Sequence, residues 1–441
     1  RRRYNDGEIP PGRKSGRPKM TYGEVIMKKI SNKVYLALNV PFMAVLVGVM
    51  IALIVVASAW SEVVSIFLHG YGFVENERTD EIIEEGMALG EEIVGDGIVL
   101  LKNEVIDEDA GKKSLPLDSF GAGSKINVFG WASIDWVAGG YGSGFSNTLL
   151  QKMKLYEALD EADIEYNTEL RKMYTDFFAQ SATAYGTTWD EKRGDIEIGK
   201  NKKFRLHEPG AAYYTDEVIN NAKEFSDTAL VVLGRVGGEG QDLLELQTKQ
   251  PQVNGSDEEM TDNSKHYLEL STEEREMIQA ASEACDNVVV VLNICNAMEL
   301  GFLNDPELGI DSCILVGTTG LTGVRSVIDV LSGEVNPSGR TADTFAADFT
   351  KAPSFATSTN NGVLAYTDRP AENYAYYSWY VDYTDDIYVG YRYYETAYAD
   401  MEKEAAGSGD EWYAENVVYP FGYGLSYTDF EWTVKSISQE S

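Results

Sequence analysis

Four short apolar runs, rich in Val, Ile and Leu, constrain the fold of this chain more than any other feature. They lie at residues 126–130, 229–234, 287–293 and 313–317, and three of them close on a glycine. Runs that are apolar throughout, instead of alternating, are typical of strands buried on both faces of a parallel sheet. The stretches between them show helical periodicity. The sequence therefore predicts an α/β sandwich with a mainly parallel sheet flanked by helices.

Two of the intervening helices carry boundary signals. Ser271 and Glu274 form a capping box ahead of an apolar face, and this helix leads directly into the third run. A second helix extends from Val324 to Leu331 and is predicted to stop near Gly333. From about residue 80 to 415 the chain is long enough to bury one sizeable core.

The loop after the second apolar run is a candidate active-site segment. Residues 234–242 read Gly-Arg-Val-Gly-Gly-Glu-Gly-Gln-Asp. In open α/β sheets, ligands bind beyond the carboxyl ends of the strands, and glycines on both sides of Glu239 leave its carboxyl unobstructed. We expect Glu239 and Asp242 at the rim of the site, with Arg235 as a further candidate substrate contact. The motif alone fits a solvated acidic loop equally well.

The distribution of charge indicates where the chain is located. The formal net charge is −34, yet residues 1–33 carry ten Lys or Arg against three Asp or Glu. The uncharged, strongly apolar stretch 34–60 follows, long enough as a helix to cross about 30 Å of hydrocarbon. A basic segment in front of such a helix favours a cytoplasmic N-terminus and an extracellular remainder.

We therefore interpret residues 1–33 as a basic cytoplasmic tail, 34–60 as a single-pass membrane anchor in contact with lipid, and 61–79 as a linker. A cleaved signal peptide is the alternative, because residues 57–59 (Ala-Ser-Ala) fit the small-residue cleavage pattern. An exported acidic domain repels polyanions, so no nucleic-acid partner is expected.

The cysteines and histidines predict no metal site, no disulfide framework and no cofactor. Cys285, Cys295 and Cys313 lie in apolar or helical surroundings without paired spacing, and the three histidines are scattered.

Two polar regions are predicted to be irregular. Residues 246–266 read as a loop after the Glu239 segment, either a flap over the site or an insertion without function. Residues 354–415 are rich in Tyr, Asp and Ser. Their tyrosines are expected to pack an extended segment onto the sheet, with stacking on sugar rings as the alternative.

Several motifs, in order, resemble the C-terminal α/β sandwich domain of glycoside hydrolase family 3 over about residues 80–430. The motifs lie at residues 97–104 (Gly-Ile-Val-Leu-Leu-Lys-Asn-Glu), 115–117, 139–144, 238–242, 336–340 (Asn-Pro-Ser-Gly-Arg), 387–394 and 419–430.

The resemblance implies a retaining, exo-acting β-glycosidase similar to β-glucosidases, with a β-linked oligosaccharide or glycoside as substrate. Such enzymes use two carboxyl groups about 5 Å apart, one as nucleophile and one as acid/base. In family 3 the nucleophilic Asp lies in a (β/α)8 barrel, and the acid/base Glu comes from a loop of the sandwich. Glu239 matches that Glu, and Asp242 matches the Asp of the Glu-Gly-x-Asp-Arg pattern. The Arg expected next is Leu243 here.

The resemblance also implies an arrangement of domains. No stretch of this chain predicts a barrel, so the nucleophile is not expected in it. Some family members place the sandwich first and the barrel last. We therefore expect the sandwich at 80–415, the start of a fibronectin type III-like domain at 416–441, and a barrel downstream in a longer protein. The alternatives are a membrane-anchored, non-catalytic carbohydrate-binding protein and a structural surface protein.

Overall fold

The computed structural model describes residues 32–60, 77–140, 152–184, 206–238, 243, 246–249, 260–262, 264–357, 363–365, 379–381, 383, 385–431 and 433–438. The chain divides into two compact units, one up to Thr79 and one from Asp80 onward. Each unit is described by itself.

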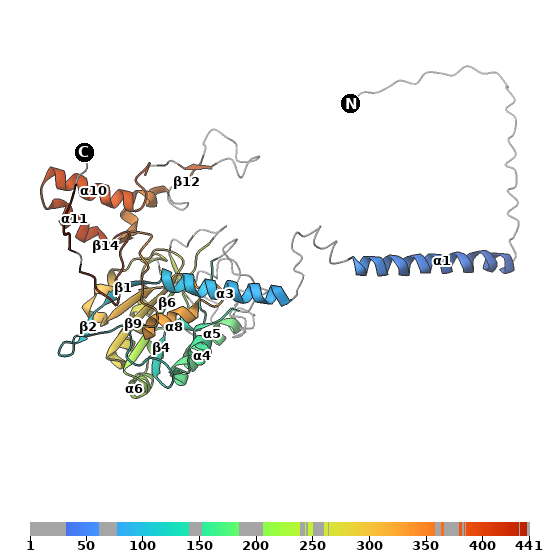
Figure 1. The fold of residues 1–441 in the computed structure, drawn as a ribbon, viewed down its shortest axis with the longest axis horizontal. Coiled ribbons are helices and arrows are strands. Elements are labelled where there is room, and N and C mark those ends of the chain that lie inside the picture. Colours follow the sequence, from blue (N-terminus) through green and yellow to red (C-terminus); the bar gives the residue numbers. More distant parts are fainter. Residues whose placement is uncertain are drawn as a thin grey trace, which may run out of the picture. The chain divides into compact units, whose positions relative to one another are not determined.

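The first unit contains one long apolar helix, α1 (Asn32–Ala59), drawn in blue in Figure 1. Its central window, Asn39–Val56, has a mean hydropathy of 2.6 and exposes its apolar side chains. The helix is long and apolar enough to cross a membrane, a property that signal sequences share. Pro41 lies inside the helix, in its third turn.

The second unit is built on a six-stranded sheet with the order β1-β10-β9-β6-β4-β5. All neighbouring strands are parallel except β1, which runs antiparallel to β10. The strands are β1 (Val99–Asn103), β4 (Lys125–Phe129), β5 (Glu165–Tyr166), β6 (Thr228–Arg235), β9 (Asn287–Ile294) and β10 (Ser312–Leu315). The four apolar runs of the sequence are therefore strands β4, β6, β9 and β10, and the predicted mainly parallel sheet is confirmed.

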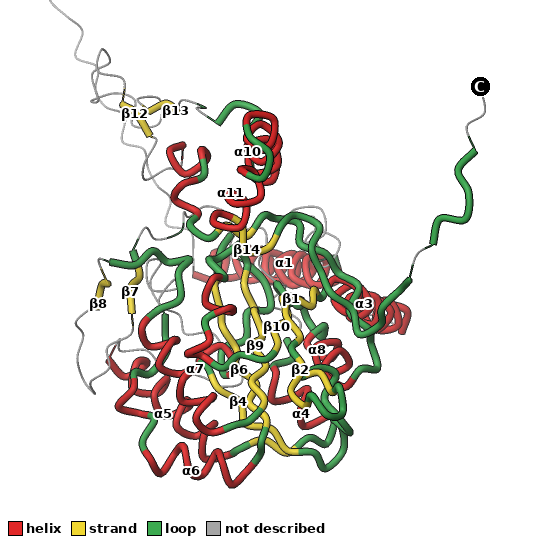
Figure 2. The backbone as a smooth tube through the Cα atoms, turned by 90° about the vertical axis from the view of Figure 1, so that its left-hand side faces the viewer, coloured by secondary structure: helices red, strands yellow, loops and turns green. Residues whose placement is uncertain are grey.

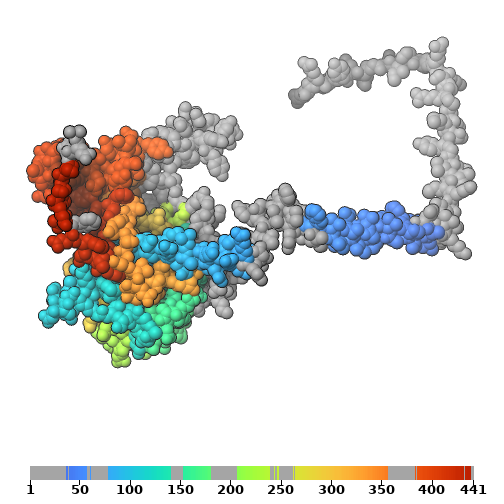
Figure 3. All heavy atoms as spheres, viewed as in Figure 1, coloured from blue at the N-terminus to red at the C-terminus, as the bar shows by residue number. Residues whose placement is uncertain are grey.

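Helices cover both faces of this sheet (Figure 2). α6 and α7 pack on β4 and β6 on one face, with α5 beside α6, whereas α4 and α8 contact each other on the other face. The helices are α3 (Glu77–Gly97), α4 (Leu155–Glu161), α5 (Thr168–Ala184), α6 (Asp216–Phe225), α7 (Thr272–Ala284) and α8 (Val324–Ser332). α3 lies against α8, as Figure 3 shows in light blue and orange, and Glu91 pairs there with Arg325 at 2.6 Å.

The two predicted helix boundaries are confirmed. Ser271 caps α7, its hydroxyl accepts the Glu274 N–H, and the Glu274 carboxylate accepts the Ser271 N–H in return. α8 ends at Gly333, whose φ of 83° is a left-handed conformation that favours glycine. Both helices bury their apolar faces in the main core, which includes Val231, Val290 and Val327 at 0% exposure.

The C-terminal region differs from the extended segment that the sequence predicted. It contains two helices in contact, α10 (Tyr391–Glu404) and α11 (Ser408–Asn416), with a small core of their own around Tyr394 and Trp412. The tyrosines are used inside this helical pair more than against the sheet, because Tyr393 and Tyr394 pack on Trp412. Tyr374, Tyr376 and Tyr377 lie outside the described residues.

In the described part of the second unit, four two-stranded pairings accompany the main sheet. They are β2 (Val105–Asp107) with β3 (Lys112–Lys113), β7 (Gln247–Lys249) with β8 (Met260–Asp262), β11 (Phe345–Ala346) with β14 (Val417–Tyr419), and β12 (Val363–Ala365) with β13 (Trp379–Val381). The β7–β8 ladder falls within residues 246–266, where only a loop was predicted. Short 3-10 turns include η1 (Trp131–Ser133), η4 (Ala211–Tyr213), η5 (Gly301–Asn304), η6 (Pro306–Leu308), η7 (Phe349–Lys351) and η8 (Pro353–Thr357).

Candidate active site

The carboxyl ends of β4, β6 and β9 meet at one edge of the sheet. The parallel registers place Phe129 beside Val231 and Arg235 beside Ile294. The loops that leave these strands therefore start side by side, at the edge where open α/β sheets bind ligands. Asn293 at the end of β9 ties this edge together, because its amide donates to Val137 O and Gly317 O and accepts the Val137 N–H.

Glycines let the loops approach closely. A Cβ on Gly140 would lie 2.8 Å from Gly237 O, and a Cβ on Gly237 would lie 2.1 Å from Asn296 Oδ1. Asn296 Oδ1 is buried and accepts no hydrogen bond within the described part of the chain. A buried acceptor without a donor is unusual. The buried Asn296 Oδ1 therefore marks a polar position beside Gly237, which is two residues before Glu239 in the sequence.

The two carboxylates predicted from the sequence, Glu239 and Asp242, lie outside the described residues, which stop at Gly238 and resume at Leu243. The described chain leads from β6 through Gly237 and Gly238 to the residue before Glu239. Leu243 packs against Leu206 and Tyr267. An apolar contact therefore occupies the position where the family pattern has an Arg.

Arg235, predicted as a substrate contact, is fully buried instead. Its five N–H groups all donate within the protein: to both carboxylate oxygens of Glu274 at 2.5 and 2.7 Å, and to the backbone oxygens of Gly234, Tyr267 and Glu269. None of its donors is left for a sugar, and the side chain is 0% exposed. This geometry does not support the predicted sugar contact and gives Arg235 the role of fixing the end of β6 to the amino end of α7.

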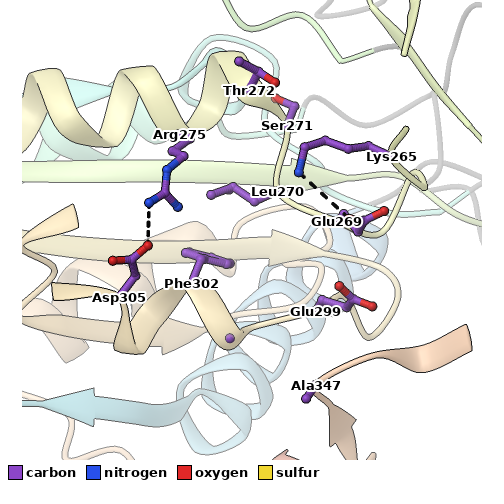
Figure 4. A pocket seen from close by; sticks show the side chains of 11 residues that line it. Lys265, Glu269, Leu270, Ser271, Thr272, Arg275, Glu299, Phe302, Asp305 and Ala347 are labelled. Atoms are coloured by element: carbon purple, nitrogen blue, oxygen red, sulfur yellow. Dashed lines mark hydrogen bonds and ion pairs between the residues drawn. The ribbon is translucent and has the colours of Figure 1, made fainter. Parts of the chain in front are cut away.

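A cavity of about 340 Å³ opens beside this edge, between the amino end of α7 and the segment after β9. Figure 4 shows Arg275 and Asp305 facing each other toward one end and Glu299 toward the other. Arg275 pairs with Asp305 at 2.5 Å, and Lys265 lies 3.9 Å from Glu269. Charged side chains of both signs therefore line the cavity.

Glu299 is a carboxyl at this edge that the sequence did not single out. It is half-buried, and its Oε1 accepts the Phe349 N–H at 3.2 Å. Burial raises the pKa of Glu299 to about 7, with the charges of Glu269 and Asp348 acting in the same direction against the Phe349 hydrogen bond. Glu299 follows the end of β9, so the rule that indicated Glu239 after β6 also applies to it.

Comparison with known proteins identifies the domain. Residues 98–427, more than half of the chain, match the family described as the glycosyl hydrolase family 3 C-terminal domain. The chain belongs to glycoside hydrolase family 3. The resemblance seen in the motifs is therefore confirmed over most of the second unit.

Two proteins named as β-glucosidases are similar to this family 3 chain over most of its length. β-Glucosidase A of Butyrivibrio fibrisolvens is 30% identical over 370 residues, which are 81% of this chain and 36% of that protein. A β-glucosidase of Ruminococcus albus is 29% identical over 340 residues, 77% of this chain and 28% of that protein. The chain thus spans only about a third of the length of these relatives.

Two solved β-glucosidase structures share the fold of this family 3 domain. A β-glucosidase from Paenibacillus barengoltzii superposes with a TM-score of 0.54 at 29% identity, covering 81% of this chain and 31% of that one. β-Glucosidase 3B from Thermotoga neapolitana, solved in complex with α-D-glucose, gives 0.54 at 28% identity, with 79% and 39% covered.

The described part of this family 3 domain contains no candidate metal site and no disulfide bond. No group of three His, Cys, Asp or Glu there has a geometry that would hold a metal ion. All three cysteines are free thiols: Cys285 and Cys313 are buried, and Cys295 is partly exposed beside the Gly237 loop. Burial raises the pKa of Cys295, although the Gly237 N–H donates a hydrogen bond to its sulfur. The environment therefore disfavours the reactive thiolate form of Cys295.

Proposed function

We propose that this chain supplies the acid/base half of the active site of a retaining, exo-acting β-glycosidase, with Glu239 as the acid/base. The observation that carries the proposal is the family 3 match over residues 98–427, which includes the glycine loop leaving the carboxyl end of β6. The relatives are named as β-glucosidases, and one related structure was solved with glucose. A β-glucoside is therefore the proposed substrate class.

The proposed reaction divides the two carboxyl groups between domains. Retaining glycosidases need a nucleophile and an acid/base about 5 Å apart. The acid/base protonates the leaving oxygen and then activates water as a general base. Glu239 would serve this role, and Asp242 would hold the loop or contact a sugar hydroxyl. The nucleophilic Asp would come from a (β/α)8 barrel downstream, in the part of the relatives that this chain does not span.

In the proposed topology, the protein is anchored in the cell membrane and its family 3 domain lies on the extracellular side. Its support is the apolar helix α1 behind a basic segment, with the acidic domain following it. We propose a cytoplasmic N-terminus, an anchor at residues 34–60, and a fibronectin type III-like domain that begins at 416–441. Protease added to intact cells would remove the family 3 domain if this topology holds, and would leave it untouched in the opposite orientation.

The test of the acid/base role is Glu239→Gln in the full-length gene product. We expect at least about a hundredfold loss of kcat/KM on a β-glucoside with a poor leaving group, and a much smaller loss on one with an activated aryl leaving group, which needs no acid assistance. Glu224→Gln is the matched control. Glu224 is exposed near the end of α6, which leads into the amino end of β6, opposite the candidate site. Equal losses on both substrates would remove Glu239 from the acid/base role.

The division between domains is tested by comparing the present chain with the full-length product on the same aryl β-glucoside. Activity only in the longer protein is expected. Activity in the chain of 441 residues alone would mean that the nucleophile lies within it. Inactivity of both, with sugar binding retained, would favour an anchored carbohydrate-binding protein.

A further inference from the structure

Helix α3 exposes an apolar stripe on the side that faces away from the rest of the described domain. Ile82, Leu89 and Ile93 are 55%, 56% and 62% exposed. Their spacing of seven and four residues places them on one side of the helix. The opposite side packs on α8, where Gly95 lies against Ser326. Within the described part of the chain, α3 is therefore apolar on two sides and covered on one.

A glycine completes this stripe. Gly86 lies between Ile82 and Leu89 on the same side of the helix, and we call Ile82, Gly86, Leu89 and Ile93 the outer face of α3. A Cβ on Gly86, or on Gly90 beside it, would meet no atom within 4 Å. No contact there requires glycine, which is unfavourable inside a helix. Glycine does let a second backbone approach closely, so the outer face combines apolar side chains with room for a partner.

Acidic side chains run along one edge of the outer face. Glu81, Glu85 and Glu92 are exposed there, and α3 as a whole carries eight Asp or Glu against one Arg. Anionic lipid repels such a helix, because helices that lie on membranes carry Lys and Arg on their polar side. Two copies of α3 would also bring like charges together. The charge pattern thus favours a partner whose apolar surface is bordered by Lys or Arg.

The size of the outer face separates a second copy from a tethered domain. Three aliphatic side chains offer on the order of a few hundred Å², below the roughly 800 Å² per partner of a standard interface. A dimer through this face alone is therefore too small to be stable. A domain in the same polypeptide is present at a high effective concentration, so it can dock through a smaller contact.

The position of α3 indicates which tethered domain fits. Figure 1 shows α3, in light blue, leading into β1. Val99 at the start of β1 pairs with Leu315, and the same row continues through Leu292 in β9 to Leu233 in β6. Three strand spacings of about 4.8 Å make this row roughly 14 Å long. α3 therefore ends at the edge of the sheet that carries the candidate active site, and a domain that completes this site also reaches α3.

We propose that the outer face of α3 docks the barrel domain of the full-length protein, against an apolar surface bordered by Lys or Arg. The proposal rests on the downstream barrel of the proposed function. Such a domain would lie in the part of the β-glucosidase relatives that this chain does not span. Docking on α3 would hold the barrel beside the carboxyl end of β6.

Cysteine labelling tests whether the barrel covers the outer face. Leu89→Cys is introduced into the 441-residue chain and into the full-length gene product, and its reaction with a maleimide is followed by mass spectrometry of the α3 peptide. We expect labelling at least about tenfold slower in the full-length protein, because only the undocked fraction reacts. Glu224→Cys, at an exposed position near the end of α6, is the control and should react at equal rates in both proteins.

Two results of this labelling would overturn the proposal. The first is an equal rate at residue 89 in the two proteins, because the barrel then leaves the outer face open. The second is labelling of the 441-residue chain that slows as its concentration rises, because a second copy of the chain then covers the face.

A double substitution tests the contact itself. Leu89→Glu with Ile93→Glu should leave the thermal midpoint of the 441-residue chain within about 2 °C, since both side chains are exposed. In the full-length protein, the same pair should restore fast labelling at Ile82→Cys. Ala88→Glu, at an exposed position on a different side of α3, is the matched control and should leave labelling slow. Slow labelling that persists in the double variant would refute the proposed contact.

Activity separates this proposal from the proposed function. On an activated aryl β-glucoside, the double variant of the full-length protein should lose at least about tenfold in kcat/KM, because the two halves of the site are no longer held together. Ala88→Glu should stay within about twofold of wild type. An inactive wild-type protein with slow labelling at residue 89 would contradict the proposed function and support the docking. An active one with fast labelling there would contradict the docking alone.

Discussion

At the scale of single residues, the buried pair of Arg235 and Glu274 controls how β6 meets α7. Both side chains are 0% exposed, and the pair is bidentate. Taking one partner away leaves an uncompensated charge in the core, which costs more than the loss of the contact itself.

We predict that Arg235→Met lowers the free energy of unfolding by about 3–5 kcal/mol in urea titrations of the chain. Combining it with Glu274→Leu should restore most of that loss, because no charge is then left unpaired. Arg275→Met is the control, since its partly exposed pair with Asp305 should contribute less than about 1 kcal/mol. If Arg235→Met cost no more than Arg275→Met, the burial of Arg235 would be refuted.

Glu299 gives a prediction with a defined sign. Its folded-state pKa of about 7 lies above its ordinary value of 4.5, so the folded state binds more protons between these values. Its contribution to stability is complete below pH 4.5 and is lost as pH rises through 7. Thermal unfolding should therefore show that Glu299→Gln gains stability relative to wild type from pH 5 to 8, by well under about 1.4 kcal/mol per pH unit because the group is only half-buried. A difference that is flat over this range would contradict the raised pKa.

Residue roles were harder to predict than residue positions. Arg235 and Glu239 lie four residues apart in the sequence, and nothing local distinguishes a buried cation from a carboxylate at the rim of a site. Burial of Arg235 depends on Glu274, which is 39 residues away, and on two backbone oxygens of the segment before α7. Burial of the Glu208 carboxyl depends in the same way on hydrogen bonds from Tyr174 in α5 and from Tyr214 at the end of η4. Such partners follow from tertiary packing, which periodicity does not report.

At the scale of elements, periodicity predicted the buried strands and the two capped helices because each of them has a strong local signal. The C-terminal helices α10 and α11 were missed for the converse reason. Their aromatic residues pack on each other around Trp412, so no single apolar stripe faces the sheet. The β7–β8 ladder was missed because its polar strands resemble a loop in composition.

Close loop packing leads to a prediction at this scale. Gly237→Ala places a Cβ 2.1 Å from Asn296 Oδ1, so either the buried Asn296 side chain or the Gly237 loop must move. We expect a loss of about 1–3 kcal/mol in unfolding free energy. Gly90→Ala in α3, where nothing lies within 4 Å, should instead stabilise the chain by about 0.5–1 kcal/mol. The same chemical denaturation series measures both, and equal effects would argue against the close approach of the loops.

At the scale of the whole molecule, the fold and the family followed from the sequence, whereas the complete active site did not. The motifs between residues 97 and 430 fall almost entirely within one family 3 domain, whose described part is built on one six-stranded sheet. The catalytic pair of a retaining glycosidase is divided between two domains in the proposed arrangement. The sequence of this domain can therefore indicate where the proposed acid/base loop starts. It cannot indicate the residues of the second domain that the loop would face.

The C-terminal segment returns to the place where the chain enters the family 3 domain. The Leu425 N–H donates to Leu100 O at 2.8 Å as an antiparallel bridge, and the Tyr427 hydroxyl donates to Val330 O at 2.8 Å. Entry and exit of the domain are thus neighbours. A domain with adjacent ends can be inserted or moved along a gene with short connections and without rebuilding its core. In the proposed arrangement, this adjacency would let the sandwich precede its partner domain, since a gene rearrangement changes the order of modules and leaves each module's fold intact.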